Sequence, residues 1–208
     1  MIKRKTNQGF TYVELIVVLS IFAMMTSLVL FNYSAFQNKV DINVLTSDIA
    51  LKIVQAQKDA MSGKWNDSVS DPEWKPSYGV SFKLGEYFVY FIDSNNENSF
   101  DYWSSFCPSA GSDECLDNIH ITKNNKIAKL KAFNSSNTQI NETEISIGGL
   151  SINFTRPNSS AIFYAGDTKL DDVFCAEIDV STSGSNPAQS SIKVYSSGRI
   201  QLGECVVQ

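Results

Sequence analysis

The chain has 208 residues, of which 43% are hydrophobic and 19% are charged, and its formal net charge is −5. This length suits one domain of roughly 150 residues plus an N-terminal extension, and disfavours more than two domains. The acidic balance disfavours nucleic acid as a general partner, because nucleic-acid binding draws on many Lys and Arg contacts to phosphates.

The N-terminal segment is basic and then strongly apolar. Lys3, Arg4 and Lys5 precede a run from Phe10 to Phe31 whose only charged residue is Glu14. A helix of about 20 apolar residues spans the hydrocarbon core of a bilayer. We therefore expect residues 10–31 to form a transmembrane helix, with its N-terminus in the cytoplasm and the rest of the chain outside.

The following segment, 32–63, predicts an amphipathic continuation of the same helix. Apolar residues recur there at spacings of one helical turn, with charged residues between them. Gly63 is a natural stop. The apolar face that this spacing predicts consists of Val40, Val44, Leu45, Ile49, Ile53, Ala56 and Ala60.

The stretch KTNQGFTYVELIVVLSIFAMMTSLVL resembles the N-terminus of type IV pilins and of the pseudopilins of type II secretion systems. The resemblance implies that residues 1–9 are a leader, which a prepilin peptidase removes after Gly9. It also implies N-methylation of the new N-terminal residue, Phe10, and an assembly role for Glu14. The implied partners are other pilins or pseudopilins and an inner-membrane assembly platform.

An acid within an apolar helix requires an explanation, because burying a lone carboxylate in lipid costs about 2.5 to 3.5 kcal/mol. Glu14 of one subunit can neutralise the free amine of Phe10 on a staggered neighbour, which would set the stagger as well as the affinity. In the alternative interpretation, Glu14 reaches the lipid surface and has no role. The implied location is the cytoplasmic membrane first and an extracytoplasmic filament afterwards.

Beyond Gly63 the apolar pattern alternates, which predicts a globular antiparallel β domain over 64–208. YGVSFKL and YFVYFI read as a hairpin about Gly85 and Glu86, and Ser197 and Gly198 occupy the turn of another hairpin. We expect six to eight strands that pack on the long helix, an α+β, pilin-like fold. The residues with strand-like alternation elsewhere are Ile145, Ile147, Leu150, Ile152, Phe154, Phe174, Ala176, Ile178 and Val180.

The ending SSIKVYSSGRIQL, which follows a late apolar strand with a cysteine, resembles the close of H-type minor pseudopilins and related minor pilins. Major pilins often carry a helix-kinking proline at the position of Phe31. Both features favour a minor subunit that primes or caps a filament near its tip.

Four cysteines lie in the C-terminal half, and they can pair in three ways. The short spacing between Cys107 and Cys115 favours one disulfide, and Cys175 with Cys205 would tie a late strand to the chain end. Disulfides indicate an oxidising compartment.

One polar loop carries oxygen side chains at alternating positions that are typical of calcium ligands. In FIDSNNENSFDYW these are Asp93, Asn95, Glu97 and Asp101. The alternative is a hairpin tip in which Asx residues stabilise turns.

No catalytic constellation is evident, because His120 is the only histidine and no nucleophile motif accompanies it. We therefore expect a non-enzymatic structural subunit. A rival hypothesis is a binding module for DNA, a secreted substrate or a surface, and a third is a secreted enzyme released by signal peptidase. Binding would draw on Lys123, Lys126, Lys129, Lys131, Trp65, Trp74 and Trp103, although a solvated face and ordinary packing explain the same residues.

Overall fold

The computed structural model describes residues 9–63, 77–93, 100, 114–183 and 187–205, without the side chains of 28–32, 34 and 35. The chain divides into two compact units, 1–38 and 39–208. Helix α1 (Tyr12–Ser62) contributes its first part to one unit and its second part to the other.

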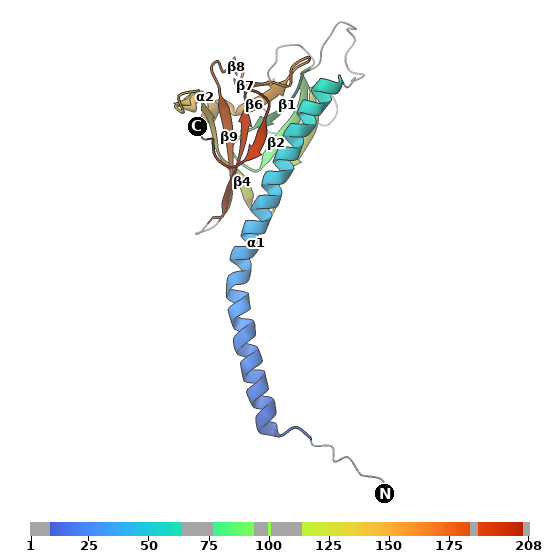
Figure 1. The fold of residues 1–208 in the computed structure, drawn as a ribbon, viewed down its shortest axis with the longest axis vertical. Helices are drawn as coiled ribbons and strands as arrows, with labels where there is room; N and C mark the ends of the chain where they lie inside the picture. The colour runs from blue at the N-terminus through green and yellow to red at the C-terminus, as the bar shows by residue number, and fades with distance from the viewer. Residues whose placement is uncertain (1–8, 64–76, 94–99, 101–113, 184–186, 206–208) are drawn as a thin grey trace. The chain divides into compact units, whose positions relative to one another are not determined.

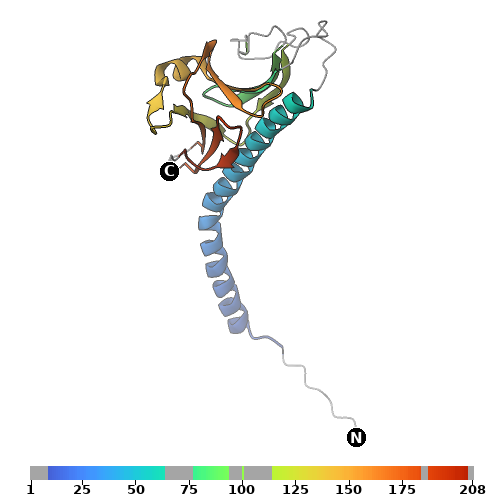
Figure 2. The same cartoon turned by 45° about the horizontal axis from the view of Figure 1, so that its top comes forward.

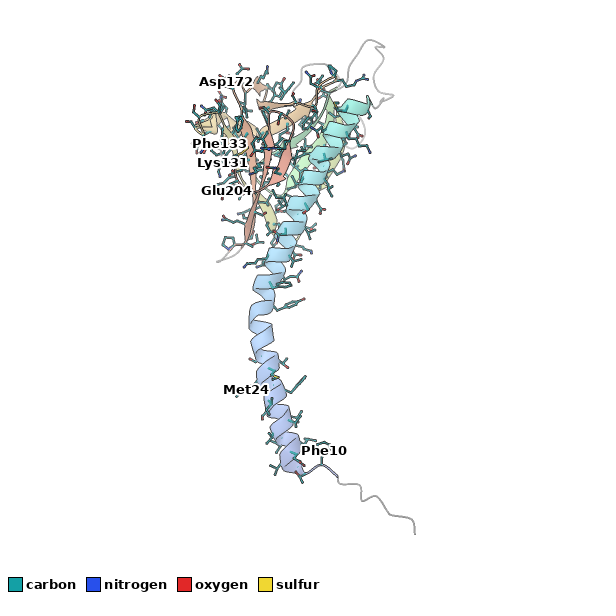
Figure 3. All side chains as sticks on the ribbon, viewed as in Figure 1. Phe10, Met24, Lys131, Phe133, Asp172 and Glu204 are labelled. Carbon is teal, nitrogen blue, oxygen red and sulfur yellow. A yellow bond between two sulfur atoms is a disulfide. The ribbon has the colours of Figure 1, made fainter. Side chains whose placement is uncertain are left out.

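In the first unit, α1 is apolar all round and its described side chains are exposed as far as Ser27. The labelled side chains of Phe10 and Met24 project from the backbone into open space (Figure 3). Phe10 is 86% exposed and Met24 is 76% exposed. Nothing that the structure describes in this unit covers the helix.

The prediction of a transmembrane helix over residues 10–31 is wrong. No helix in the described part of the chain is both long and apolar enough to cross a membrane. The predicted single-pass location in the inner membrane, which rested on this helix, is therefore also wrong.

The second unit contains two antiparallel sheets (Figure 2). Within the described residues these sheets contain eleven strands, more than the six to eight that the sequence predicts. The six-stranded sheet has the order β3-β2-β1-β6-β7-β8, and the five-stranded sheet has the order β11-β10-β9-β4-β5. The predicted fold class is thus wrong in its membrane helix, and the predicted number of strands is too low. The strands are β1 (Ser77–Phe82), β2 (Tyr87–Asp93), β3 (Cys115–His120), β4 (Asn125–Phe133), β5 (Gln139–Ile140), β6 (Leu150–Phe154), β7 (Ala161–Ala165), β8 (Thr168–Lys169), β9 (Cys175–Thr182), β10 (Gln189–Tyr195) and β11 (Ile200–Leu202).

Both predicted hairpins are present. β1 pairs with β2 in the register Val80 to Tyr90, across the turn that contains Gly85. β10 pairs with β11 in the register Val194 to Ile200. Gly85 also forms a two-residue bridge with Ile127 of β4, which links the two sheets.

The predicted strand at Ile145 and Ile147 is instead a short helix, α2 (Glu142–Gly148). Ile145 is buried and Ile147 is 72% exposed, so two residues that a strand would place on one face point to different sides. Two acids in the first turn favour a helix through its dipole, and Gly149 at φ 79° ends it. The prediction of a strand relied on the alternating isoleucines and did not take into account the acids before them and the glycine after them.

One hydrophobic core joins α1 to the inner faces of both sheets in the second unit (Figure 1). α1 contributes one face to this core, and Val40 and Val44, which the sequence predicts on that face, are exposed instead. The helix carries two apolar rows, and only one of them faces the sheets. The buried row consists of Ile42, Thr46, Ile49, Ile53, Ala56 and Ala60.

Polar contacts also fix α1 on the sheets. Gln57 donates from Nε2 to the carbonyl oxygens of Ser159 and Gly198, at 3.0 and 2.9 Å. Gly198 has φ 83°, and a Cβ there would lie 1.9 Å from the Ser159 oxygen, so this turn requires glycine. On the other sheet the Tyr90 hydroxyl donates to Asp59 Oδ2 at 2.6 Å. The helix is thus hydrogen-bonded to both sheets.

Candidate assembly site

The first turn of α1 is held by a reciprocal pair of side chains, Thr11 and Glu14. Thr11 precedes the first helical residue, and Glu14 lies three residues further on. The Glu14 backbone N–H donates to Thr11 Oγ1 at 3.2 Å, and the Thr11 backbone N–H donates to Glu14 Oε2 at 2.9 Å. This arrangement is a capping box, which satisfies two N–H groups that a helix N-terminus otherwise leaves without partners.

A third hydrogen bond strengthens this pair, because the Thr11 hydroxyl also donates to Glu14 Oε2, at 2.8 Å. The backbone N–H of Thr11, together with its hydroxyl, lowers the pKa of Glu14. Glu14 is therefore ionised at neutral pH. Both bonds from Thr11 end on one oxygen, and among the described residues no hydrogen bond ends on Glu14 Oε1.

The three residues predicted for processing and assembly lie together at this helix start. Gly9 and Phe10 are exposed and precede the capping box, so the peptide bond between them is accessible. Glu14 is exposed on the first turn. Cleavage after Gly9, N-methylation of Phe10 and assembly through Glu14 stay predictions.

Thr11 is the residue that the sequence analysis missed. The signal for it is the spacing T-x-x-E within GFTYVEL, which is the sequence pattern of a capping box. The same spacing gives Glu14 a local role in the isolated chain, beside the predicted role between subunits.

Of the four predicted calcium ligands, only Asp93 lies within the described residues. Asp93 ends β2, is 1% exposed and accepts a hydrogen bond from Ser77 Oγ at 3.0 Å. The other three residues, Asn95, Glu97 and Asp101, lie outside the described residues. Within the described ranges no group of three or more His, Cys, Asp or Glu side chains could hold a metal ion.

The predicted disulfide between Cys175 and Cys205 is confirmed. It joins the start of β9 to the segment after β11, and both cysteines are buried beside Tyr195. Cys115 is also disulfide-bonded, and its predicted partner Cys107 lies outside the described residues.

The predicted lysine cluster is not a free basic patch. Lys123 pairs with Asp41 at 2.7 Å. Lys131 pairs with Glu177 at 2.6 Å and with Asp179 at 2.8 Å. Lys126 and Lys129 are exposed on β4, and the three tryptophans of the alternative binding surface lie outside the described residues.

Lys131 of β4 forms an ion network with Glu177 and Asp179 of β9, in the five-stranded sheet. The Glu177 side chain is 3% exposed, and it also accepts the Cys205 backbone N–H at 2.6 Å. Burial alone would lower the pKa of Lys131, but hydrogen bonds to Asp179 and Glu177 outweigh it and raise that pKa. The network therefore connects β4 and β9 to the C-terminal segment.

His120 is exposed at the end of β3, opposite Tyr87 in the strand register. The non-enzymatic role stays a prediction. The candidate site with the most specific geometry is thus the start of α1.

Comparison with known proteins gives no match: no family model, no curated protein and no solved structure is similar to the chain. The comparisons therefore lend no support to the pilin and type II secretion assignments, which rest on the resemblance of the N-terminal stretch and of the ending SSIKVYSSGRIQL.

Proposed function

We propose that the chain is a structural subunit of a helical filament of the type IV pilus or pseudopilus kind, cut after Gly9 and assembled through the first part of α1. The observation that carries the proposal is an uncovered, all-round apolar helix that begins with one ordered carboxylate. Contiguous exposed apolar surface marks a site of association. Helices of other subunits would bury this surface.

In the proposed contact, Glu14 Oε1 accepts a hydrogen bond from the free amine of Phe10 on a neighbouring subunit. Thr11 of the same chain already occupies Oε2 and holds the carboxylate in place. Between packed apolar helices the two opposite charges attract strongly, because the local dielectric constant is low. A register that separates them leaves two unpaired charges, so the pair selects one axial stagger.

The proposed position is near the filament tip, as a minor subunit. Support comes from the resemblance of SSIKVYSSGRIQL, which forms the β10–β11 hairpin, to the ending of minor pseudopilins. Immunogold labelling of isolated filaments tests this position. We expect label at one end, and label along the whole length would contradict a tip role.

The test of the function is the substitution Glu14→Ala, with Glu144→Ala as its matched control. Both acids lie in the first turn of an exposed helix, but only Glu14 lies on the apolar part of α1. Loss of a buried charge partner lowers association by roughly a hundredfold or more. We expect Glu14→Ala to be absent from sheared filaments and Glu144→Ala to be present. Normal incorporation of Glu14→Ala would refute the proposal.

A further inference from the structure

The pairing of β4 has a gap on the side away from β9. At the start of β4 the Ile127 N–H donates to the Gly85 carbonyl at 2.8 Å, and the Gly85 N–H donates back at 3.2 Å. At its end Ala132 and Phe133 pair with β5. Within the described residues no strand pairs with 128–131 on this side. This gap of four residues is about 13 Å long at 3.3 Å per residue.

The backbone of Leu130 faces this gap. Along an antiparallel strand the N–H and C=O groups of every second residue face the same neighbour. Asn134 faces the β5 side, because its N–H donates to the Thr138 carbonyl at 3.1 Å, so Ala132 and Leu130 face that side too. No hydrogen bond reaches Leu130 from that side within the described residues. Such an open strand edge is a template for one more strand.

A bulge in β4 agrees with this orientation. The register of β4 against β9 shifts between Ile127 and Lys129, so one extra residue is inserted there. The insertion explains why Ile127 and Leu130, which are three residues apart, both face the gap. It also marks the point at which regular pairing on this side stops.

A cavity of about 300 Å³ lies at the gap. Residues 128–131 line it along β4, with Leu84 at the end of the bridge and Gln139 at the end of β5. Glu142 and Ser146 of α2 complete its lining. This volume is at the lower end of the range for ligand pockets, so it suits a segment of a few residues.

Charge and burial indicate which side chains would fit. Lys129 is exposed, and within the described residues no carboxylate pairs with it, whereas Lys131 is held in the ion network. Leu130 lies between them, is 6% exposed and points to the opposite face of the strand. Residues directly opposite each other on paired strands share a face. A fitting segment therefore has an apolar residue opposite Leu130 and an acidic residue opposite Lys129.

The direction of the neighbouring pairs also sets the order of these residues. Both β5 and Gly85 are antiparallel to β4. An antiparallel segment meets Lys131 first, Leu130 second and Lys129 third. Thr-Val-Glu meets these requirements. The reverse order, Glu-Val-Thr, places a third carboxylate beside those that already contact Lys131, and like charges in contact are destabilising.

We propose that the gap at residues 128–131, the β4 slot, is a docking site for an extended acidic peptide segment of another protein. The segment adds as a short strand between Gly85 and β5. Backbone hydrogen bonds to Leu130 provide affinity, and the contact with Lys129 provides specificity. The proposal is independent of the proposed function, because it concerns the second unit alone.

NMR spectroscopy of the isotope-labelled full chain tests the slot. The probe is acetyl-Thr-Val-Glu-amide. Its controls are the reversed peptide, acetyl-Glu-Val-Thr-amide, and a probe with N-methylvaline, which lacks the N–H opposite Leu130. We expect the probe to move the Leu130 amide signal, and both controls to bind with a dissociation constant roughly tenfold higher or more. Equal binding of the three peptides, or an unmoved Leu130 signal, would overturn the proposal.

A charge reversal tests the contact with the acidic residue. Lys129→Glu is compared with Lys126→Glu, because both lysines are exposed on β4 but only Lys129 lines the cavity. Lys129→Glu should raise the dissociation constant of the probe roughly tenfold or more, and Lys126→Glu should leave it unchanged. Equal binding by the two variants would contradict the proposed docking.

A bulky side chain tests the cavity itself. Ser146→Trp and Thr143→Trp both alter exposed positions of α2, but only Ser146 lines the cavity. We expect the probe to bind Thr143→Trp as it binds the native chain and not to bind Ser146→Trp, since the indole fills the slot. Unchanged binding by Ser146→Trp would exclude the slot as the docking site.

Two rival occupants have their own signatures. Inorganic phosphate that moves the Leu130 signal, together with a probe that does not, would indicate a simple anion site. A Leu130 signal that moves with protein concentration and not with the probe would indicate a second copy of the chain in the slot. Either result would overturn the proposal.

Discussion

The two parts of α1 differ in what surrounds them. In the first unit the described apolar side chains from Phe10 to Met25 are all exposed, and the ordered polar group, Glu14, is at the surface. In the second unit Ile49 and Ile53 are fully buried, and a charged side chain, that of Glu177, is enclosed in an ion network. We infer that the second unit provides the stability of the fold and that the first unit provides surface for association.

Among the substitutions that test this difference between the two parts of α1, Ile53→Ala should lower the free energy of unfolding most. Ile53 is 0% exposed between α1 and the sheets, and its truncation should lower the free energy of unfolding by about 4 kcal/mol. The neighbouring Val54 is 44% exposed, so Val54→Ala should change it by less than about 0.5 kcal/mol. Urea unfolding followed by circular dichroism measures both. Equal losses would show that the two faces of α1 do not differ in burial.

A smaller loss of stability is expected from Lys131→Met, which removes the cation from the network of Lys131, Glu177 and Asp179. The buried Glu177 carboxylate would then lack its counter-charge, at a cost of about 3 kcal/mol. Lys126→Met on the same strand is the control, because Lys126 is exposed. Urea midpoints should fall for Lys131→Met alone. A Lys131→Met protein as stable as the Lys126→Met protein would exclude the network as a source of stability.

The network also predicts how stability depends on pH. Burial would raise the pKa of Asp179, but the hydrogen bonds from Lys131 and Ser191 and the positive charge of Lys131 together outweigh burial and lower that pKa below the ordinary 3.8. A lowered pKa in the folded state gives stability that is present above pH 3.8 and is lost as the pH falls through the folded value. The raised pKa of Lys131 gives stability that is present below 10.5 and is lost as the pH rises through its folded value.

Urea midpoints measured from pH 2 to 6, for the native chain and for Asp179→Asn, test the acid side. We expect the native midpoint to fall below about pH 4 and the variant to show a shallower fall, because asparagine does not titrate. Identical slopes would show that Asp179 does not contribute to the acid loss.

Local signals explain which parts of the fold the sequence predicts. The hairpins about Gly85 and Gly198 were predictable because alternating apolar residues flank a short turn with glycine. α2 was not, because the alternation at Ile145 and Ile147 also fits one helical turn with a buried and an exposed residue. The division into two sheets depends on contacts such as the bridge from Gly85 to Ile127, which are remote in the sequence.

The candidate site divides in a similar way. Glu14 was predictable because a charge within an apolar run is conspicuous, whereas Thr11 was missed because its role depends on a hydrogen-bonded pair. The sequence does not show that β2 extends to Asp93 and buries it. The calcium loop stays a prediction, because its other three residues lie outside the described residues. The apolar face of α1 was placed partly on Val40 and Val44 because two rows at the same spacing overlap in the sequence, and only packing decides between them.

Thr11→Val tests the first unit, and we expect it to have the smallest effect on stability. The substitution keeps the side-chain shape but removes the hydroxyl group that accepts from the Glu14 N–H and donates to Oε2. Loss of a helix cap costs about 1 kcal/mol, and in an exposed first turn it should fray the helix start without altering the urea midpoint of the second unit. The pKa of Glu14, followed by NMR, should rise toward its ordinary value while remaining partly lowered, because the backbone N–H of Thr11 is still present. Thr26→Val is the control, since among the described residues the Thr26 hydroxyl bonds the Phe22 carbonyl of the same helix and not Glu14. An unchanged Glu14 pKa in Thr11→Val would mean that the hydroxyl does not order the carboxylate, and assembly through Glu14 would then depend on the neighbouring subunit to position it.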